Sequence, residues 1–296
     1  MSPVVFSYAD PSAPRLKRGL IRAVEIATGQ QTLKRLYDTH RATPAGCESF
    51  WQAAIRLLAL DVRFDRTSLD AVPREGAVVI VANHPYGVLD GLVVSWLAEQ
   101  VRPDFKVLTH SLLLRAPEAR PYLLPVDFSG TSEARRTNLA SRAAARSHLA
   151  AGGCLIVFPA GGISTVPDRL GRGVAVDAPW QPFTAQLIQR ARATVVPLRF
   201  AGQNSRLFHI ASHLSLTLRL SLIFREVKNR IGTAVEVTIG APVAFADLDR
   251  IGERRDLTAT LRAMVEDLPP IQARVLPPTR SRFTRSLKRR RPPMAA

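Results

Sequence analysis

Short apolar runs alternate with longer amphipathic segments along most of this chain of 296 residues. The runs are brief, rich in β-branched residues and bounded by turn residues, which predicts strands near 76–83, 105–109, 122–127, 153–159, 194–201 and 234–240. The longer segments predict helices near 89–100, 132–151, 180–193 and 206–224. This alternation predicts an α/β fold with a mainly parallel central sheet flanked by helices.

Three segments of different character follow one another along the chain. We expect residues 1–75 to form an N-terminal helical extension, residues 76–277 the α/β domain and residues 278–296 a basic, disordered tail. Within the extension, residues 15–41 are expected to be helical with an interruption at Gly29. Basic side chains there accompany apolar residues at near-helical spacing, which suits a helix on an anionic membrane surface. A helix packed on the domain with a solvated basic face explains the same pattern.

The chain carries 41 basic and 24 acidic residues, a net charge of +17, and seven of the basic residues lie between Arg280 and Arg291. Nucleic acid, anionic lipid or an acidic protein would each suit such a charge. No zinc-finger spacing, helix-turn-helix signature or RNP run is present, and aromatic residues make up only 6% of the chain. We therefore expect an anionic membrane surface as partner and no nucleic acid.

Two cysteines and six histidines show no metal-binding spacing, so we expect no metal site. The N-terminus lacks the apolar block of a signal peptide, and no uninterrupted apolar run reaches the roughly 18–20 residues of a membrane-spanning helix. The sequence thus predicts a cytoplasmic protein that is peripheral on the inner face of the plasma membrane.

His84 and Asp90 lie in the run Val81-Ala-Asn-His-Pro-Tyr-Gly-Val-Leu-Asp-Gly91, directly after a predicted strand. Pro85 and Gly87 break regular structure there, which allows His84 to sit in the turn and Asp90 in the first turn of the next helix. A carboxylate beside an imidazole fixes the tautomer of the ring and stabilises the imidazolium, so the pair can act as a general base. His84 and Asp90 are therefore the candidate catalytic residues.

Two further predicted strands end in glycine-containing loops. The strand near 153–159 leads into Phe158-Pro-Ala-Gly-Gly162, and the strand near 194–201 leads into Gly202. The glycines at 161 and 162 let a ligand approach the backbone closely, and their amides can form an anion-binding concavity. Because active sites of open α/β sheets lie beyond the carboxyl ends of the strands, we expect these loops and His84 to share one rim.

These motifs resemble those of the lysophospholipid acyltransferase superfamily, which includes the glycerol-phosphate acyltransferases. The resemblance covers residues 76–243 and rests on motifs in the family's order: Asn83-His84-Pro85 with Asp90-Gly91, Phe158-Pro159-Ala160-Gly161, and Val196-Pro197 with Gly202. It implies a glycerol-phosphate acyltransferase-like fold and transfer of a fatty acyl group to a lyso-lipid in phospholipid or related membrane-lipid synthesis. The implied donor is acyl carrier protein or acyl-coenzyme A, with no further cofactor.

The resemblance also implies roles for individual residues. His84 would be the general base and Asp90 its orienting partner. Five residues separate them in this HX5D motif, whereas most members have four. The residues implied in substrate binding are Asn83, Phe158, Pro159, Gly161 and Gly162. Asn83 is also expected to shape the turn after the strand.

Two positions depart from the usual second motif of the family. Ala160 replaces a glutamate and Ile163 an arginine, and both of those residues are associated with a glycerol-phosphate acceptor. The pattern resembles a hemolysin-like branch of the superfamily. We therefore expect an acceptor other than lysophosphatidic acid, such as an amino-acid lipid or another lysophospholipid, unless another arginine binds the phosphate.

Arg135 and Arg136 begin the helix predicted at 132–151 and are candidates for binding a phosphate or carboxylate of the acceptor. They suit an ordinary basic helix surface equally well. Two alternatives to acyl transfer are also consistent with the sequence. One is a non-catalytic basic protein that binds a membrane surface or nucleic acid on the same scaffold, and the other is a lipid hydrolase that uses the same cleft.

Overall fold

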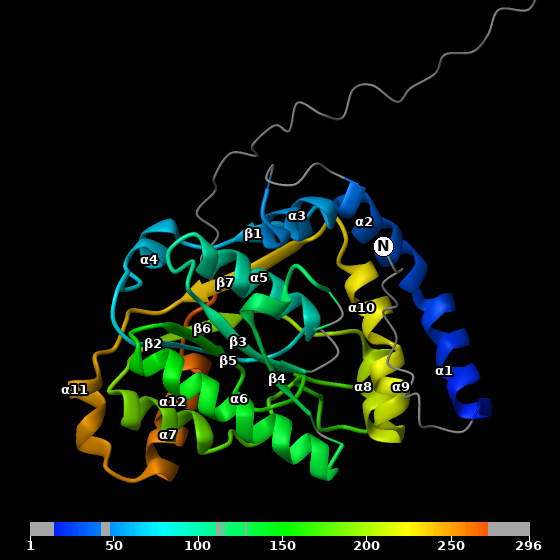
Figure 1. Ribbon diagram of the computed structural model, residues 1–296. Coiled ribbons are helices and arrows are strands. Elements are labelled where there is room, and N and C mark those ends of the chain that lie inside the picture. The colour runs from blue at the N-terminus through cyan, green and yellow to red at the C-terminus, as the bar shows by residue number, and fades with distance from the viewer. Residues whose placement is uncertain (1–14, 43–47, 111–113, 115, 128, 272–296) are drawn as a thin grey trace, which may run out of the picture.

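Seven strands form one sheet in the computed structural model, which describes residues 15–42, 48–110, 114, 116–127 and 129–271 (Figure 1). The strands are β1 (Asp61–Arg63), β2 (Val78–Ala82), β3 (Lys106–His110), β4 (Leu123–Val126), β5 (Cys154–Val157), β6 (Thr194–Phe200) and β7 (Ala234–Ile239). Their order in the sheet is β1-β7-β6-β2-β5-β3-β4. Only the β6–β7 pair is antiparallel, and the other neighbours are parallel. The prediction of a mainly parallel α/β fold is confirmed.

Helices cover both faces of this sheet. They are α1 (Arg15–Thr28), α2 (Gln30–Ala42), α3 (Phe50–Leu57), α4 (Arg66–Asp70), α5 (Val88–Glu99), α6 (Ser132–Ala150), α7 (Phe183–Ala191), α8 (Arg206–Leu214), α9 (Leu216–Ser221), α10 (Ile223–Asn229), α11 (Phe245–Leu248) and α12 (Arg254–Glu266). Side chains of α3 and α5 pack in one core, and those of α6, α7 and α12 pack in a second core.

Strand β2 lies between these two cores, and its five residues are all buried. Val78 and Ile80 belong to the core with α3 and α5, whereas Val79 and Val81 belong to the core with α6, α7 and α12. Successive side chains of a strand point to opposite faces, so a strand covered on both faces must be apolar throughout. That requirement explains why β2 was recognisable as a short continuous apolar run.

The six predicted strands are present, and β1 is an additional short strand that pairs with β7. It lies in the segment expected to be a helical extension, so residues 61–63 contribute to the sheet of the α/β domain. The helix predicted at 206–224 is instead divided into α8, α9 and α10. The first division occurs because Ser215 adopts an extended conformation, with φ −164° and ψ 133°.

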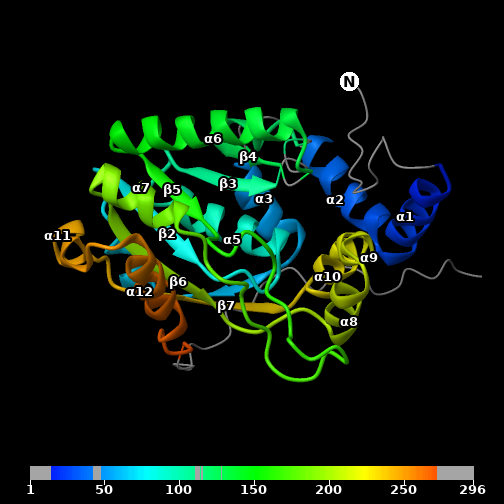
Figure 2. The same ribbon diagram turned by 90° about the horizontal axis from the view of Figure 1, so that it is seen from below.

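Helices α1 and α2 lie beside α8, α9 and α10 at one end of the molecule (Figure 2). The break between them falls at Gly29, as the sequence predicts, and α1 buries Ile21 and Glu25. Cys47 and the basic tail expected at 278–296 lie outside the described residues. Within the described ranges, no helix combines the length and apolar character needed to cross a bilayer.

Candidate active site

His84 and Asp90 come together where β2 leads into α5. Nδ1 of His84 lies 3.0 Å from Oδ2 of Asp90, with the histidine side chain 18% exposed and the carboxylate fully buried. The two atoms are in close contact without the alignment of a hydrogen bond. Asp90 lies in the first turn of α5, which is the placement that the spacing of the motif requires. Because Nδ1 faces the carboxylate, Nε2 is the ring nitrogen available to a substrate.

The turn between β2 and α5 holds Asp90 through its own backbone. The amides of Tyr86 and Gly87 donate to Oδ2 of Asp90 at 2.8 and 2.9 Å. Burial raises the pKa of the Asp90 carboxyl above its ordinary value, while the contact with His84 and the two amide hydrogen bonds oppose that rise. The carboxylate therefore has three partners in an otherwise dehydrated position, and all of them favour its charged form.

The backbone of His84 is held on both sides by the segment that follows β5. The amide of Ser164 donates to the carbonyl of His84 at 2.8 Å, and the amide of His84 donates to Oδ1 of Asp177 at 3.3 Å. The hydroxyl of Ser164 donates to the same Oδ1, and Nε1 of Trp180 donates to Oδ2 at 2.9 Å. We call Ser164 and Asp177 the His84 clamp. Sequence reasoning did not single out Asp177 because no local motif surrounds it.

Phe158 completes the surroundings of the imidazole. Its ring stacks on the ring of His84, with the centroids 4.1 Å apart and an interplanar angle of 29°. The next residue, Pro159, accepts a hydrogen bond from the amide of Gln181 at 3.0 Å through its carbonyl. These contacts place the loops after β2 and β5 side by side, as expected of neighbouring parallel strands.

The two glycines of the second motif differ in their surroundings. The amide of Gly161 donates to the carbonyl of Phe158 at 3.0 Å, so it closes a turn. Gly162 has open space beside its Cα. Ile163 then packs against the first motif, because a Cβ added at Gly87 would lie 2.6 Å from its Cδ1. Gly87 also has a φ of +76°, a conformation that glycine adopts without strain.

Asn83 links the loop after β2 to β6. Its Nδ2 donates to the carbonyl of Phe200 at 2.9 Å, and its Oδ1 accepts from the amide of Phe200 at 2.7 Å. The side chain thus continues the pairing of the two strands. Among the roles considered from the sequence, this geometry matches the shaping of the turn.

The third motif meets the first through Tyr86. Its hydroxyl donates to the carbonyl of Ala201 at 2.7 Å, and the Arg230 guanidinium lies 4.2 Å from the centre of its ring. Gly202 has a φ of +94°, and a Cβ at this position would overlap the Tyr86 hydroxyl. The loops after β2, β5 and β6 therefore share one rim of the sheet.

Arg135 and Arg136 lie in the first turns of α6 and are exposed. This helix follows β4, the edge strand, and β5 and β3 separate β4 from β2. At a spacing of about 4.8 Å per strand, that places β4 roughly 15 Å from β2. The structure therefore does not bring the two arginines into the contacts around His84, and their role in acceptor binding stays a prediction.

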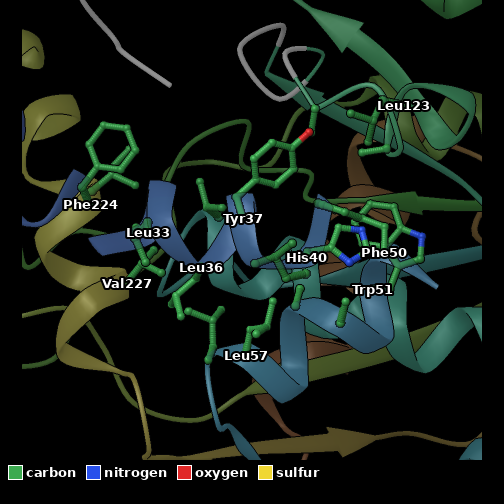
Figure 3. A pocket seen from close by; sticks show the side chains of 18 residues that line it. Leu33, Leu36, Tyr37, His40, Phe50, Trp51, Leu57, Leu123, Phe224 and Val227 are labelled. Atoms are coloured by element: carbon green, nitrogen blue, oxygen red, sulfur yellow. The ribbon is translucent and has the colours of Figure 1, made fainter. Parts of the chain in front are cut away.

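An apolar pocket of about 170 Å³ opens beside α5. Figure 3 shows side chains of α2, α3 and α10 that line it, among them Leu33, Trp51 and Val227. Val88 and Leu92 of α5 belong to the same lining, and Val88 follows directly on the turn that holds Asp90. The pocket was not predicted, because its walls come from helices that are far apart in the sequence.

Comparison with known proteins identifies the family. A family model described as "Acyltransferase" matches residues 22–266. The chain belongs to this acyltransferase family. The prediction of an acyltransferase enzyme is confirmed, and the match spans all three motifs of the rim. In the described residues, no group of three or more His, Cys, Asp or Glu side chains is placed to hold a metal ion.

Two relatives with acyltransferase names agree with this assignment. The acyltransferase is 28% identical to the lyso-glycine lipid O-acyltransferase of Bacteroides thetaiotaomicron over 200 residues, 64% of this chain and 70% of the relative. It is 26% identical to the lyso-glycine lipid O-acyltransferase of Phocaeicola vulgatus over 200 residues, 64% of this chain and 68% of the relative. The crystal structure of the 1-acyl-sn-glycerophosphate (LPA) acyltransferase PlsC from Thermotoga maritima aligns over 84% of this chain and 85% of that chain, with 15% identity and a TM-score of 0.45.

Proposed function

We propose that this acyltransferase moves a fatty acyl group from a thioester donor to the hydroxyl of a lyso-lipid acceptor, with His84 as general base. The observation that carries the proposal is the contact between His84 and Asp90, and an apolar pocket lined by Val88 and Leu92 lies along the same helix α5. An imidazole oriented by a buried carboxylate can take a proton from a hydroxyl, and an apolar pocket suits a fatty acyl chain. Membership of the acyltransferase family supports the same reaction class.

The reaction needs no covalent enzyme intermediate. Nε2 of His84 takes the hydroxyl proton while the acceptor oxygen attacks the carbonyl carbon of the thioester. The tetrahedral intermediate then collapses, the C–S bond breaks, and the leaving sulfur receives the proton from His84. The products are an ester and a free thiol. General-base catalysis of this kind contributes about 10²–10⁴-fold to the rate.

The acceptor that we propose is an amino-acid lipid, and a glycine headgroup is the first candidate. Two relatives bear the name lyso-glycine lipid O-acyltransferase. The aliphatic side chains of Ala160 and Ile163, which carry neither a carboxylate nor a guanidinium, also favour an acceptor other than lysophosphatidic acid. The open backbone at Gly162 is a candidate for binding the oxyanion or the headgroup.

We further propose that the protein acts at the anionic inner face of the plasma membrane. A net charge of +17 favours such a surface and suits either acyl carrier protein or coenzyme A as the carrier of the acyl group. Large apolar side chains that are exposed to solvent also support a membrane location. Most of them lie in the loop before Asp177 and on α8 and α9. We call these residues the exposed apolar patch: Leu170, Val174, Val176, Leu207, Leu214 and Leu218.

The reaction is tested with purified protein and a panel of lyso-lipids that carry glycine, other amino-acid or glycerol-phosphate headgroups. Each acceptor is offered with acyl carrier protein and with coenzyme A as donor, and mass spectrometry follows the acylated product. We expect donor-dependent ester formation that is lost in His84→Ala. Free fatty acid in place of acylated lipid would instead indicate a hydrolase, and no product with any pair would contradict the proposal.

A further inference from the structure

Arg219 of α9 carries a charge for which the described part of the chain provides no counter-ion. Its Nη2 donates to the carbonyl of Ile163, and its guanidinium lies 5.5 Å from the centre of the Phe208 ring. Among the described residues, no carboxylate forms an ion pair with it. The contrast with Arg225 is direct, because Arg225 pairs with Glu226 at 3.3 Å.

Burial of Arg219 has an electrostatic consequence. It lowers the pKa of the guanidinium below its ordinary value, and no nearby acid opposes that effect. An arginine stays protonated in proteins, so the charge persists in this half-buried position. The Ile163 carbonyl uses only one of the five N–H donors of the guanidinium. A half-buried cation with donors that no described residue uses gains from an anion that arrives as a ligand.

The position of Arg219 connects it to the candidate active site. Ile163 precedes Ser164, whose amide donates to the carbonyl of His84, and its side chain meets Gly87 of the turn that holds Asp90. The guanidinium is thus attached to the same short segment that holds the general base.

Two histidines of α8 fix the continuation of this segment. Nδ1 of His209 accepts from the amide of Val166 at 3.4 Å, and Nε2 of His213 lies 2.8 Å from the Val166 carbonyl. Neither interaction places an acid beside Arg219.

We propose that Arg219 binds the anionic group of the acceptor, a carboxylate or phosphate oxyanion, while the acceptor hydroxyl lies at His84. This inference rests on the proposed function for the identity of the ligand as acceptor. A glycine joined to a fatty acid through its nitrogen keeps a free carboxylate, and a guanidinium can bind such a group through two parallel hydrogen bonds. Arg219 is then a specificity-determining residue for acidic headgroups.

The test compares binding of acidic and neutralised probes without any acyl donor. The probes are N-hexadecanoylglycine, its methyl ester and hexadecyl phosphate, and equilibrium dialysis gives the dissociation constants. We expect wild-type protein to prefer an acid to the ester by about 10- to 100-fold, the range for a hydrogen bond to a charged group. Arg219→Met should bind acid and ester alike, and Arg219→Lys should keep part of the preference. Tight binding of the phosphate alone would assign the site to phosphate, and tight binding of the glycine probe alone to carboxylate.

Arg206→Met is the matched control. Arg206 also donates to a backbone carbonyl of the loop after β5, that of Leu170 at 2.8 Å, but its side chain is exposed. The control should keep the wild-type preference. Arg219→Gln, which retains an N–H donor for Ile163, replaces Arg219→Met if thermal unfolding shows that the methionine variant does not fold. An acid preference that persists in the uncharged variant, or that is absent from wild type, would overturn the inference.

Turnover measured separately distinguishes this inference from the proposed function. If wild-type protein shows an Arg219-dependent acid preference but transfers no acyl group to any acceptor, the anion site stands and the proposed reaction fails. If acyl transfer proceeds with equal KM for acceptors in wild type and Arg219→Met, the reaction stands and the role of Arg219 fails.

Discussion

The carboxylate of Asp177 accepts a hydrogen bond from the hydroxyl of Ser164, and both residues also bond to the backbone of His84. The His84 amide donates to the Asp177 carboxylate, and the His84 carbonyl accepts from the Ser164 amide. His84, the proposed general base, is therefore positioned through its main chain as well as through its ring. Asp90 orients the imidazole, whereas the His84 clamp determines where the loop that carries it lies.

Loss of the His84 clamp should reduce turnover without removing a group that touches substrate. Asp177→Ala is expected to lower kcat by about 10- to 100-fold, because displacement of a catalytic group by about 1 Å has effects of this size. KM for the acyl donor should change little. Steady-state kinetics with circular dichroism as a folding check measures both. Asp177→Asn, which keeps an acceptor oxygen, should recover part of kcat, and its failure to exceed the alanine variant would argue against positioning through this hydrogen bond.

Replacement of His84, the proposed general base, should have the largest effect on activity. His84→Ala is expected to lower the rate of acyl transfer by about 10²–10⁴-fold while the fold persists, since general-base catalysis contributes that range. Asp90→Asn should have an equal or smaller effect, because it removes the orienting carboxylate and leaves the base. Mass-spectrometric product assays on both variants give the comparison. Near-normal turnover in His84→Ala would refute the mechanism.

Asp90→Asn should also change how stability depends on pH. Burial raises the pKa of Asp90 in the folded state, so the ionised carboxylate reduces stability, and that loss develops as pH rises from the ordinary carboxyl pKa through the raised one. The asparagine variant lacks this titration but keeps an oxygen for the amides of Tyr86 and Gly87. We therefore expect it to be more stable than wild type at neutral pH, with the difference closing in acid.

Urea unfolding across a pH series measures this difference. His84→Ala is the matched control, since it removes the neighbouring imidazole and leaves the buried carboxylate in place. A stability difference between Asp90→Asn and wild type that is constant over the whole pH range would show that Asp90 does not titrate as proposed.

A larger side chain in the apolar pocket should shorten the preferred acyl chain. Leu92→Phe fills space between α5 and the pocket-lining side chains of α2 and α3, so competition between long and short acyl donors should shift toward the short ones. Overpacking of this kind destabilises by about 1–3 kcal/mol, which thermal unfolding reports. Leu139→Phe on α6, where the leucine is 64% exposed, is the control and should keep the wild-type chain-length profile.

Charge introduced into the exposed apolar patch should weaken membrane binding. Val174 and Leu214 are 77% and 71% exposed, so Val174→Asp with Leu214→Asp should leave the fold intact and reduce sedimentation with anionic vesicles. Removal of residues 278–296 should weaken the same binding, since each basic residue near an anionic surface contributes about 1 kcal/mol.

Leu139→Asp lies outside the patch on another exposed helix surface and should bind as wild type does. Salt should weaken binding of all these proteins to anionic vesicles, because surface charges are screened within about 10 Å at 0.1 M ionic strength. Equal binding of wild type to neutral and anionic vesicles would contradict the electrostatic part of the proposal.

The buried strands and the contact between the first and second motifs were predictable because their signals are local. Strand β5, Cys154–Val157, is apolar throughout since helices cover both its faces, and such runs stand out in a sequence. Strand β1 gave no such signal, because Asp61 and Arg63 are exposed on a short edge strand. Parallel topology alone then brought the loops after β2 and β5 to the same rim.

The side chains that act across the fold could not be predicted in the same way. Asp177 lies 93 positions from His84 in the sequence, and Arg219 lies 56 positions from Ile163. Both reach the site because irregular loops and short helices fold back over the rim, and no periodicity encodes such contacts. Helix α12 was not among the predicted helices, although its signal is local. Leu257, Leu261 and Val265 recur every four residues on its buried side, which is typical of a helix.

Tyr86 and Gly202 form a matched pair in which the hydroxyl of one residue occupies the volume that a side chain of the other would need. Gly202 of the third motif therefore has no side chain because the Tyr86 ring of the first motif occupies that space. A residue with a Cβ at 202 would push on the turn that carries His84, through the ring of Tyr86. The volume available at either position is consequently set by the other, although a large part of the chain separates the two motifs.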